Sequence, residues 1–319
     1  MRKLFLVTLI LAISAMAFAA GAKAAPSGQK RVLFTNAFNT APFCAPLNAQ
    51  ALQTAKENNI ELTIVDGQAD ANVQLNQIRN AISQKYDGII YFPADKEGSI
   101  TIIKTLNESK VPYAVIDSKV DDSVMNTITV FAGPDNVYMG EVAGNACVKL
   151  LNGKGNVVIL EGSPGTDPAT NRQKGFLNIV SKYPDIKILA SQTVDGWDPA
   201  KAMTIMQDYI TRFGNQIDFL YSHDDGLFQG AQQAIAQAGM TGKFKAISTG
   251  ANNVGCAAID AGNLYGSVLH SAKEEGQLGV EAIVKVMNGE IKPGDNVWLK
   301  CSSPLVTKEN IEQWRGWGW

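Results

Sequence analysis

The sequence has few of the side chains from which metal centres and nucleic-acid-binding surfaces are built. Its 319 residues include two histidines and four cysteines, none in a Cys-x-x-Cys pair, which leaves little for a metal site. Acidic residues (30) outnumber basic ones (28), and no run of Lys/Arg with interleaved aromatics offers a face for nucleic acid. We therefore expect no metal and no nucleic-acid partner.

Motifs of nucleotide-binding and serine-dependent enzymes are missing as well. There is no Gly-x-x-x-x-Gly-Lys-Ser/Thr loop, and the nearest approach to Gly-x-Ser-x-Gly, at residues 162–165, has no histidine partner in its context. Scattered aspartates do not exclude the paired acids of a glycosidase, so a secreted sugar hydrolase stays an alternative that turnover assays separate from a binding protein. We expect no cofactor.

The first 24 residues are predicted to be a cleaved export signal. Arg2 and Lys3 precede an apolar run, Leu4–Ala20, and Ala22-Lys23-Ala24 supplies the small residues that a signal peptidase recognises. A membrane anchor is the alternative, because the run is nearly long enough to span a bilayer. Cys44 is the first cysteine and lies far from the cleavage site, so no lipid-bearing cysteine is expected. The mature chain is expected to be free in a periplasm or outside the cell, and the periplasm is the location we predict.

The remaining chain is predicted to be α/β. Hydrophobic residues make up 45 % and charged residues 18 %, which fits globular domains, one large or two medium. Apolar runs alternate with amphipathic stretches in units of about 25–30 residues, the spacing of crossovers between parallel strands. The expected strands are Val32–Thr35, Leu62–Val65, Gly88–Phe92, Tyr113–Asp117, Thr127–Phe131, Asn156–Glu161, Ile188–Gln192, Phe219–Ser222, Lys245–Thr249 and Ser267–His270. The expected helices are Leu47–Asn58, Val73–Gln84, Ser99–Ser109, Val137–Leu151, Ala169–Lys182, Ala200–Phe213, Gly226–Ala238 and Gln277–Met287.

A turn in mid-chain favours two sheets over one barrel. Nearly ten strands exceed what a closed eight-stranded barrel needs, and the rhythm restarts after Gly133-Pro134-Asp135, a turn signal. We interpret this turn as a crossing between two lobes.

Polar and aromatic side chains follow the predicted strands. Ligands of open α/β sheets bind beyond the carboxyl ends of the strands, so these side chains are the candidate site. Carboxylates and amides exchange hydrogen bonds with hydroxyls, and aromatic faces pack on the C–H faces of a sugar ring, which predicts a small polyhydroxylated ligand. The candidate ligand-binding residues are Asn36, Asn39, Phe43, Asp117, Ser118, Asp167, Arg172, Trp197, Asp224, Asn252 and His270.

The chain resembles the type I periplasmic substrate-binding proteins of ABC sugar importers, in the ribose-binding-like group. The resemblance covers residues 30–313 and rests on the order and spacing of several motifs. These are N-T-A-P-F at 39–43, Y-D-G-I-I-Y-F-P-A-D at 86–95, V-I-D at 115–117, D-N at 135–136, E-G-S at 161–163, R-Q-K-G-F at 172–176, Y-S-H-D-D at 221–225 and V-T-K-E-N at 306–310.

The resemblance implies two doubly wound parallel-sheet lobes joined by a three-crossing hinge. The implied lobes are 30–132 with 271–298, and 133–270 with 299–319. It further implies that ligand is captured by lobe closure, and that the partner is a membrane ABC permease. A sensory role that presents ligand to a chemoreceptor shares every one of these sequence features.

Some residues match the positions that hold the sugar in this group. The resemblance places the ring of Phe43 against the sugar, gives Asp117 the role of gripping ring hydroxyls, and makes Trp197 a stacking ring of the second lobe. Asp224 stands where the group often has Asn, and His270 where it often has Gln.

Other positions depart from the group. Ser118 follows Asp117 where an Arg is usual, and a second family Arg aligns with Thr170, which leaves Arg172 a more structural role. A family Asp falls on Gly250, for which Asn252 or Asn253 compensates. The less cationic site favours a neutral polyol, a differently shaped monosaccharide or an amine-bearing sugar.

Asp117-Ser118 and residues 306–310 also resemble the autoinducer-2 and rhamnose-binding branch, although Asn36 and Asn39 stand where its first-loop Lys is expected.

Three further expectations concern pairs and caps. One carboxylate of Asp224-Asp225 is expected to bind a ligand hydroxyl and the other to cap the helix that follows. Asp167, before a proline, is expected either to cap a helix or to bind ligand. Cys256 and Cys301 are expected to form a disulfide near the cleft of the second lobe.

Overall fold

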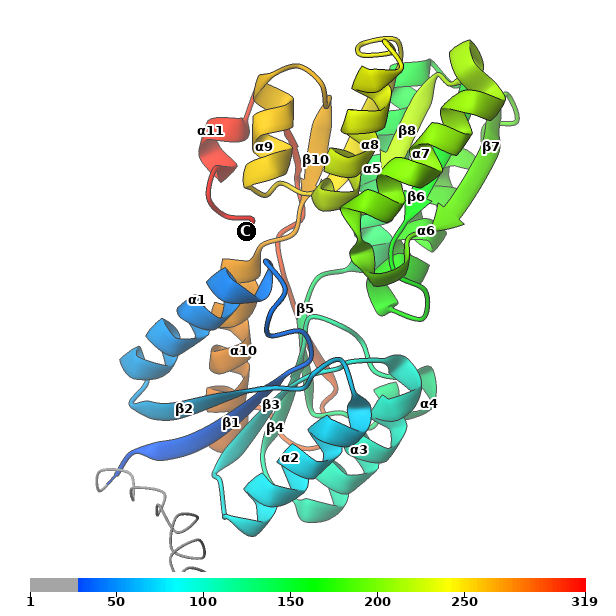
Figure 1. The fold of residues 1–319 in the computed structure, drawn as a ribbon. Coiled ribbons are helices and arrows are strands. Elements are labelled where there is room, and N and C mark those ends of the chain that lie inside the picture. Colours follow the sequence, from blue (N-terminus) through cyan, green and yellow to red (C-terminus); the bar gives the residue numbers. More distant parts are fainter. Residues whose placement is uncertain (1–27) are drawn as a thin grey trace, which may run out of the picture.

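The computed structural model describes residues 28–319, which form two α/β lobes with a narrow connection between them (Figure 1). The export signal predicted for residues 1–24 lies outside the described residues. None of the described helices is long and apolar enough to cross a membrane.

The first lobe is built on a parallel sheet with strand order β11-β5-β4-β3-β1-β2. Its strands are β1 (Lys30–Asn36), β2 (Ile60–Asp66), β3 (Gly88–Phe92), β4 (Tyr113–Ile116), β5 (Val130–Gly133) and β11 (Val297–Lys300). Its helices are α1 (Cys44–Glu57), α2 (Ala71–Ser83), α3 (Lys96–Ser109), α4 (Asp122–Met125) and α10 (Ala272–Met287).

The second lobe repeats this architecture with strand order β12-β10-β9-β8-β6-β7, in which only the β10–β12 pair is antiparallel. Its strands are β6 (Gly155–Glu161), β7 (Ile186–Thr193), β8 (Phe219–Ser222), β9 (Lys245–Gly250), β10 (Gly266–Leu269) and β12 (Leu305–Thr307). Its helices are α5 (Asn136–Leu151), α6 (Asp167–Val180), α7 (Pro199–Phe213), α8 (Asp225–Gln237), α9 (Asn253–Asp260) and α11 (Ile311–Trp314).

Each sheet is buried on both faces, which explains the continuous apolar runs in the sequence. In β1, Val32 and Phe34 join the core under α1 and α10, whereas Leu33 joins the core under α2 and α3. In β6, Val157 packs toward α5 and α6, and Val158 packs toward α7 and α8. The α/β fold with two doubly wound lobes is therefore confirmed.

Polar residues begin most of the helices. Each accepts a hydrogen bond from a backbone N–H in the first helical turn, which satisfies a donor that the helix leaves unpaired. These N-cap residues are Asp70, Asp95, Asp121, Asp135, Asp198, Asp224, Asn252 and Ser271.

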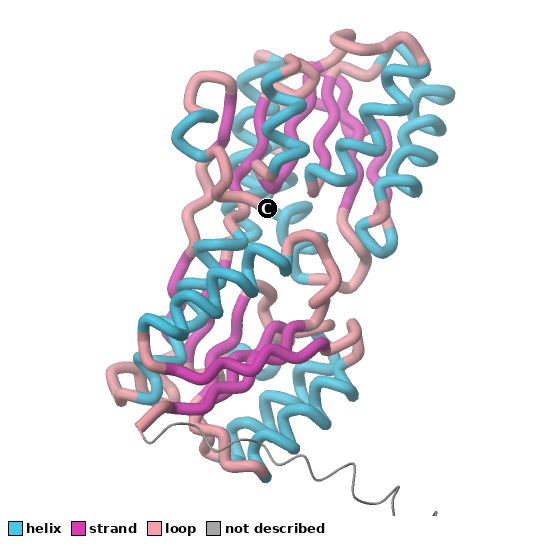
Figure 2. Tube along the Cα trace, turned by 60° about the vertical axis from the view of Figure 1, so that its left-hand side comes forward, coloured by secondary structure: helices cyan, strands magenta, loops and turns pink. Residues whose placement is uncertain are grey.

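Three segments cross between the lobes: β5 to α5, β10 to α10, and β11 to β12 (Figures 1 and 2). They are tied to one another. Cys301 N donates to Gly133 O at 3.2 Å, and Lys300 Nζ lies 2.9 Å from a carboxylate oxygen of Asp135. Leu269 N donates to Pro304 O at 2.9 Å. The connection is therefore a bundle of three hydrogen-bonded segments.

The element boundaries agree with the prediction most closely where apolar runs are continuous. Gly88–Phe92 and Phe219–Ser222 are strands over the predicted residues. The strand predicted at Thr127–Phe131 is shifted to Val130–Gly133, so the glycine expected in a turn ends the strand. The last long helix begins five residues before the predicted Gln277, because Ser271 caps it. Helices α4, α9 and α11 and strands β11 and β12 were not predicted.

Two glycines allow α5 and α6 to pack backbone to backbone. A Cβ atom on Gly140 would lie 2.1 Å from Arg172 O, and one on Gly175 would lie 1.9 Å from Val137 O. No L-residue with a side chain fits at either position without moving a helix.

We expect Gly175→Ala to lower the free energy of unfolding by about 1–3 kcal/mol, because overpacking outweighs the better helix propensity of alanine. Urea unfolding measures the change. Lys174→Ala, at an exposed position one residue earlier in α6, is the control and should leave stability within about 0.5 kcal/mol. Equal stabilities of the two variants would contradict the close packing.

Candidate functional site

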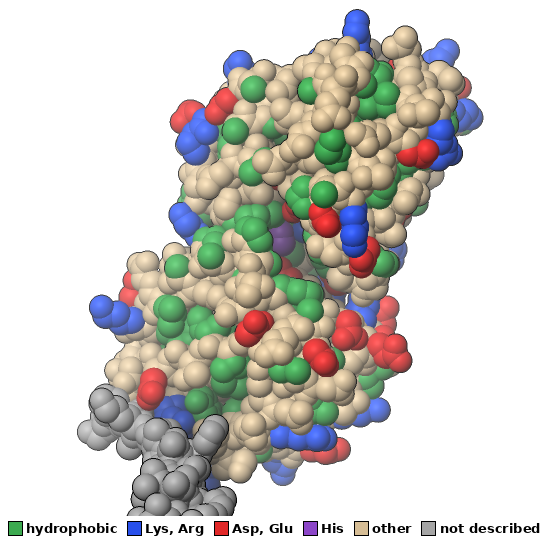
Figure 3. Space-filling model, in the orientation of Figure 1, with side chains coloured by type: hydrophobic (Ala, Val, Ile, Leu, Met, Phe, Trp, Pro, Cys, Tyr) green, Lys and Arg blue, Asp and Glu red, His purple; other side chains and the backbone are tan. Residues whose placement is uncertain are grey.

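A cavity of about 830 Å³ lies between the lobes, where the carboxyl ends of both parallel sheets meet. The space-filling view shows this hollow, with a histidine side chain in its depth (Figure 3). Nine of the eleven predicted residues line the cavity: Phe43, Asp117, Ser118, Asp167, Arg172, Trp197, Asp224, Asn252 and His270.

Asn36 and Asn39 are placed elsewhere, and neither lines the cavity. Asn36 is fully buried; its Nδ2 donates to Asn48 Oδ1, and its Oδ1 accepts from Phe38 N at 3.0 Å. Asn48 in turn donates to Asn39 Oδ1 at 2.6 Å. The prediction that these two amides face the ligand is corrected, because their hydrogen bonds are used to shape the loop that presents Phe43.

Asp117 is held at the end of β4 in an unusual backbone conformation. Its φ is +61°, in the left-handed region that residues other than glycine rarely adopt. Ser118 Oγ donates to its Oδ2 at 2.7 Å, and His270 Nε2 lies 3.5 Å from its Oδ1. Burial raises the pKa of Asp117, but the hydrogen bond and charge of His270 bring it below its usual value. The residue therefore presents an ionised carboxylate to the cavity.

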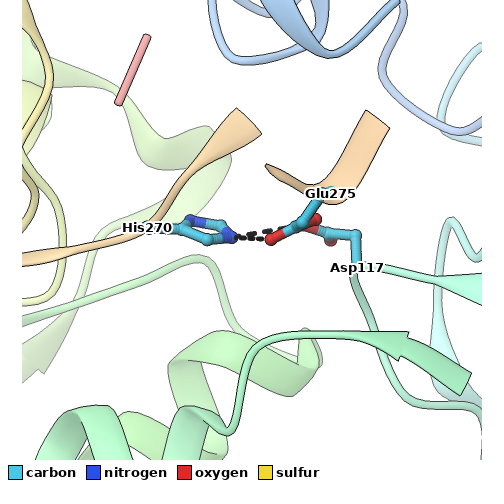
Figure 4. Close-up of side chains that lie close together, drawn as sticks. All are labelled: Asp117, His270 and Glu275. Carbon is cyan, nitrogen blue, oxygen red and sulfur yellow. Dashed lines mark hydrogen bonds and ion pairs between the residues drawn. The ribbon is translucent and has the colours of Figure 1, made fainter. Parts of the chain in front are cut away.

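Asp117, His270 and Glu275 form a buried network at the crossing between β10 and α10 (Figure 4). His270 Nε2 lies 2.6 Å from Glu275 Oε1, and Arg172 Nη2 lies 3.2 Å from His270 Nδ1. Burial alone would lower the pKa of His270, but Glu275 raises it. Burial raises the pKa of Glu275. The network joins residues of both lobes.

The same three side chains could in principle hold a cation, since one ligand atom from each lies within 4.8 Å of the others. However, His270 Nε2 and Glu275 Oε1 are in direct hydrogen-bond contact. The atoms that would bind an ion are thus used by each other, as in an ion-pair network.

Trp197 forms an aromatic wall on the second lobe. It ends a short 3₁₀ turn with φ of +55° and follows Gly196, whose φ is +72°. Its ring rests on Gly162, where an added Cβ would lie 1.9 Å from Trp197 Cη2. Both the turn and the missing side chain at Gly162 position the ring beside the cavity.

Phe43 provides an aromatic wall on the first lobe. Its ring stacks on the imidazole of His270 with centroids 4.6 Å apart. One face of the ring is therefore occupied by the protein, which fixes the orientation of the ring at the cavity.

Asp224 and Asp225 have different roles from those predicted. Asp224 both lines the cavity and caps α8, its Oδ1 accepting from Gly226 N at 2.7 Å. Asp225 is fully buried and accepts hydrogen bonds from Ser248, Ser267 and the backbone N of Asn252. Asp224 therefore has both of the predicted roles, at the cavity and as the helix cap, which were expected of two separate residues. Asp225 instead holds strands β9 and β10 to α8.

Asp167 and Arg172 both form hydrogen bonds with the side chain of Asn136. Asp167 follows the N-cap of α6 and accepts from Asn136 Nδ2 at 2.8 Å. Arg172 donates from Nε to Asn136 Oδ1 at 3.0 Å and from Nη1 to His223 O at 2.7 Å. Lys96 Nζ, from the first lobe, lies 3.9 Å from Asp167 Oδ1. Asp167 and Lys96 therefore form an ion pair between the two lobes at the wall of the cavity.

The sequence analysis missed several lining residues. Lys96 follows Asp95 at the end of β3, and Lys119 follows Ser118 after β4, so a longer window after each strand would have included both. Gln229 lies inside a helix, and Trp319 follows no strand directly. No pattern in the sequence indicated these two.

The expected disulfide between Cys256 and Cys301 is absent, and all four cysteines are free thiols. Cys256 is a residue of α9 and is buried in the core of the second lobe, whereas Cys301 lies at the crossing after β11, where its backbone N donates to Gly133 O. The prediction was wrong because it placed both residues near the cleft of the second lobe.

Comparison with known proteins adds relatives of known role. Residues 32–291 match the family model described as "Periplasmic binding protein domain". A xylitol-binding protein of Mycolicibacterium smegmatis is 29 % identical over 293 residues, covering 92 % of this chain and 81 % of the relative. A galactofuranose-binding protein of Escherichia coli is 33 % identical over 195 residues, or 60 % of each chain.

The fold of this chain is also similar to that of solved structures. An ABC transporter solute binding protein from Bacillus halodurans, solved with bound myo-inositol, superposes with a TM-score of 0.82 at 24 % identity. The match covers 91 % of this chain and 99 % of that chain.

The buried carboxyl of Asp225 should make stability depend on pH. Burial, followed by the charge of Asp224, raises the pKa of Asp225 to about 7, against about 4 in an unfolded chain. Between these values the folded chain holds a proton that the unfolded chain has lost. The free energy of unfolding therefore falls as pH rises, by up to about 1.4 kcal/mol per unit.

We expect Asp225→Asn to weaken this decline, because the amide does not titrate. Urea unfolding at several pH values between about 4 and 7 compares the slopes. Asp122→Asn, which changes a carboxylate with 92 % of its side chain exposed, should keep the wild-type slope. A common slope for all three proteins would show that Asp225 is ionised throughout.

Proposed function

The chain belongs to the family of periplasmic binding protein domains, and on that premise we propose that it captures a monosaccharide or polyol by closing its two lobes. The observation that carries the proposal is the cavity between the lobes, to which each lobe contributes both carboxylate and aromatic side chains. Phe43 and Asp117 come from one lobe, and Trp197 and Asp224 from the other. This combination suits a ligand that has hydroxyls at its edge and C–H groups on its faces.

Two relatives bind ligands of this chemistry. One is named for xylitol, an acyclic polyol, and the other for galactofuranose, a monosaccharide. Both relatives support a monosaccharide or polyol as the class of ligand, and experiment must identify which one this chain binds.

The charges around the cavity favour a neutral ligand. Arg172 donates from Nε to Asn136 Oδ1 and from Nη1 to His223 O, so much of its guanidinium is already hydrogen-bonded within the protein rather than to a ligand. Lys119 Nζ lies 3.8 Å from the centre of the Trp298 ring. Four aspartates line the same cavity: Asp95, Asp117, Asp167 and Asp224. An amine on the sugar would be accepted more readily than an acid group.

Capture follows from differential affinity. A ligand that touches both lobes gains all its contacts only in the closed arrangement, so binding shifts the population toward closure. The three-segment connection provides the hinge. We propose lobes of 30–132 with 271–298 and of 133–270 with 299–319. The pairing of β11 with β5 moves two of these boundaries slightly, because it keeps Gly133 and Lys300 in the sheet of the first lobe.

The remaining parts of the proposal concern the cell. Export through the segment 1–24, location in the periplasm and docking of the closed form on an ABC permease are what membership of this family leads us to propose. A chemoreceptor is a second partner that would recognise the same closed form.

A thermal-shift screen tests the ligand class. We expect at least one of xylitol, ribose, galactose, myo-inositol, rhamnose, glucosamine and autoinducer-2 to raise the melting temperature, because a ligand that binds only the folded chain stabilises it. Gluconate and ribose 5-phosphate are the anionic controls and should give no shift. The screened ligands contain no glycosidic bond, so release of free sugar from aryl glycosides is the result that would favour a hydrolase instead.

Asp117 should contribute strongly to affinity. Asp117→Asn keeps the shape and tolerates the left-handed backbone, but it replaces an ionised acceptor by a neutral amide. We expect the dissociation constant of the ligand found in the screen to rise about 10- to 100-fold, since a hydrogen bond to a charged group contributes about 1.5–3 kcal/mol. Calorimetry measures this.

Glu108→Gln, which changes an exposed carboxylate of α3 in the same lobe, is the matched control and should bind as the wild type does. Unchanged affinity of Asp117→Asn, with the melting temperature also unchanged, would remove Asp117 from the binding site.

A further inference from the structure

The last residue of the sequence, Trp319, reaches into the cavity. The segment leading to it is anchored on the second lobe, where Ile311 of α11 is buried in the core and Trp314 packs against it. The chain then turns at Gly316, whose φ is +80°, and runs back toward the hinge. The ring at its end is half-buried and lies at the cavity wall.

The backbone before the ring is fixed by specific contacts. Ser271 Oγ donates to Trp317 O at 2.6 Å, and Asn253 N donates to Trp319 O at 2.9 Å. Gly318 packs directly on the second lobe, because a Cβ there would lie 2.4 Å from Ala251 O. These contacts fix the backbone of residues 317–319 and therefore the position from which the Trp319 ring extends.

The ring itself contacts the other lobe. Its centroid lies 5.1 Å from that of Phe43, edge-to-face, and the ring packs against the core of the first lobe. It also lies edge-to-face to His270, at the crossing after β10, with centroids 5.7 Å apart. Its far edge also faces Gly250, where an added Cβ would lie 2.9 Å from Trp319 Cη2. Trp319 thus fills the end of the cavity that lies between Phe43 and the end of β9.

We propose that Trp319 determines the size of ligand that the cleft accepts, as a third aromatic wall that blocks the cavity beside Phe43. The inference rests on the proposed function and adds the residue that selects single monosaccharides and polyols over disaccharides. The physical reason is the position of the ring: it occupies the end of the cavity beside Phe43, and its removal opens that end next to Gly250, which has no side chain of its own to fill the gap.

Two variants test the proposal against the ligand found in the screen and against a disaccharide panel of maltose, lactose and trehalose. We expect Trp319→Ala to weaken binding of the monosaccharide or polyol at least tenfold and to shift the affinity ratio toward a disaccharide at least tenfold. Trp319→Phe keeps an aromatic ring at the contact with Phe43 and should lie between wild type and Trp319→Ala. Trp317→Ala, at a ring that is 45 % exposed and does not line the cavity, is the matched control.

The outcomes separate the two proposals. If the wild type binds its ligand and both Trp319 variants keep the same affinity ratio as Trp317→Ala, Trp319 is a packing residue and the inference fails alone. If the wild type binds no member of the screen, the proposed function fails and takes the inference with it. Where Trp319→Ala melts too low for calorimetry, Trp319→Phe decides by its ratio.

Discussion

The contact between His270 and Glu275 is the interaction on which the geometry of the cleft depends. It lies where β10 of one lobe passes into α10 of the other, so its two partners belong to the sheet of the second lobe and the helix that covers the first. Asp117 approaches the same imidazole from β4, and Arg172 from α6. Buried charges of this kind are stable only when each is paired. The network therefore restricts how the lobes can be oriented while both remain folded.

That restriction explains why strained backbone is found at the cavity. Asp117 and Trp197 both have positive φ, a conformation that costs of order 1–3 kcal/mol and persists only where surrounding contacts enforce it. Ser118 and His270 enforce it at Asp117, and Gly162 makes room for it at Trp197. In both places the result is a side chain directed at the space between the lobes, which a regular strand end would not give.

The sequence predicts the fold well because its strongest signals are local. A strand such as Gly88–Phe92, buried on both faces, is apolar throughout, and the alternation of such runs with helices determines the parallel sheets. The site is predictable to the extent that it follows the strand ends. Asp117, Trp197 and Asp224 are found by that rule. Asn36 also satisfies the rule but is used by the loop, because hydrogen-bond partners such as Asn48 cannot be identified from spacing.

Contacts between segments that are far apart in the sequence cannot be predicted from local patterns. Trp319 meets Phe43 across nearly the whole chain. The absent disulfide shows the same limit from the other direction, because nothing in the sequence indicates that Cys301 lies at the crossing after β11 while Cys256 is buried in the core of the second lobe. Residues whose position depends on how three crossing segments bundle together need the tertiary structure.

The helix caps connect fold and function in the cleft. Parallel α/β topology brings the first turns of α3, α8 and α9 to the edge where the strands end, and each of these helices is capped by a cavity-lining residue: Asp95, Asp224 and Asn252. A cap uses one acceptor site of the side chain, and a carboxylate has about four. The acceptors that remain are already oriented by the cap. Folding has already restricted the rotation of these side chains, so binding a hydroxylated ligand costs less side-chain entropy. More of the free energy of the ligand contacts is then available to stabilise the closed lobes.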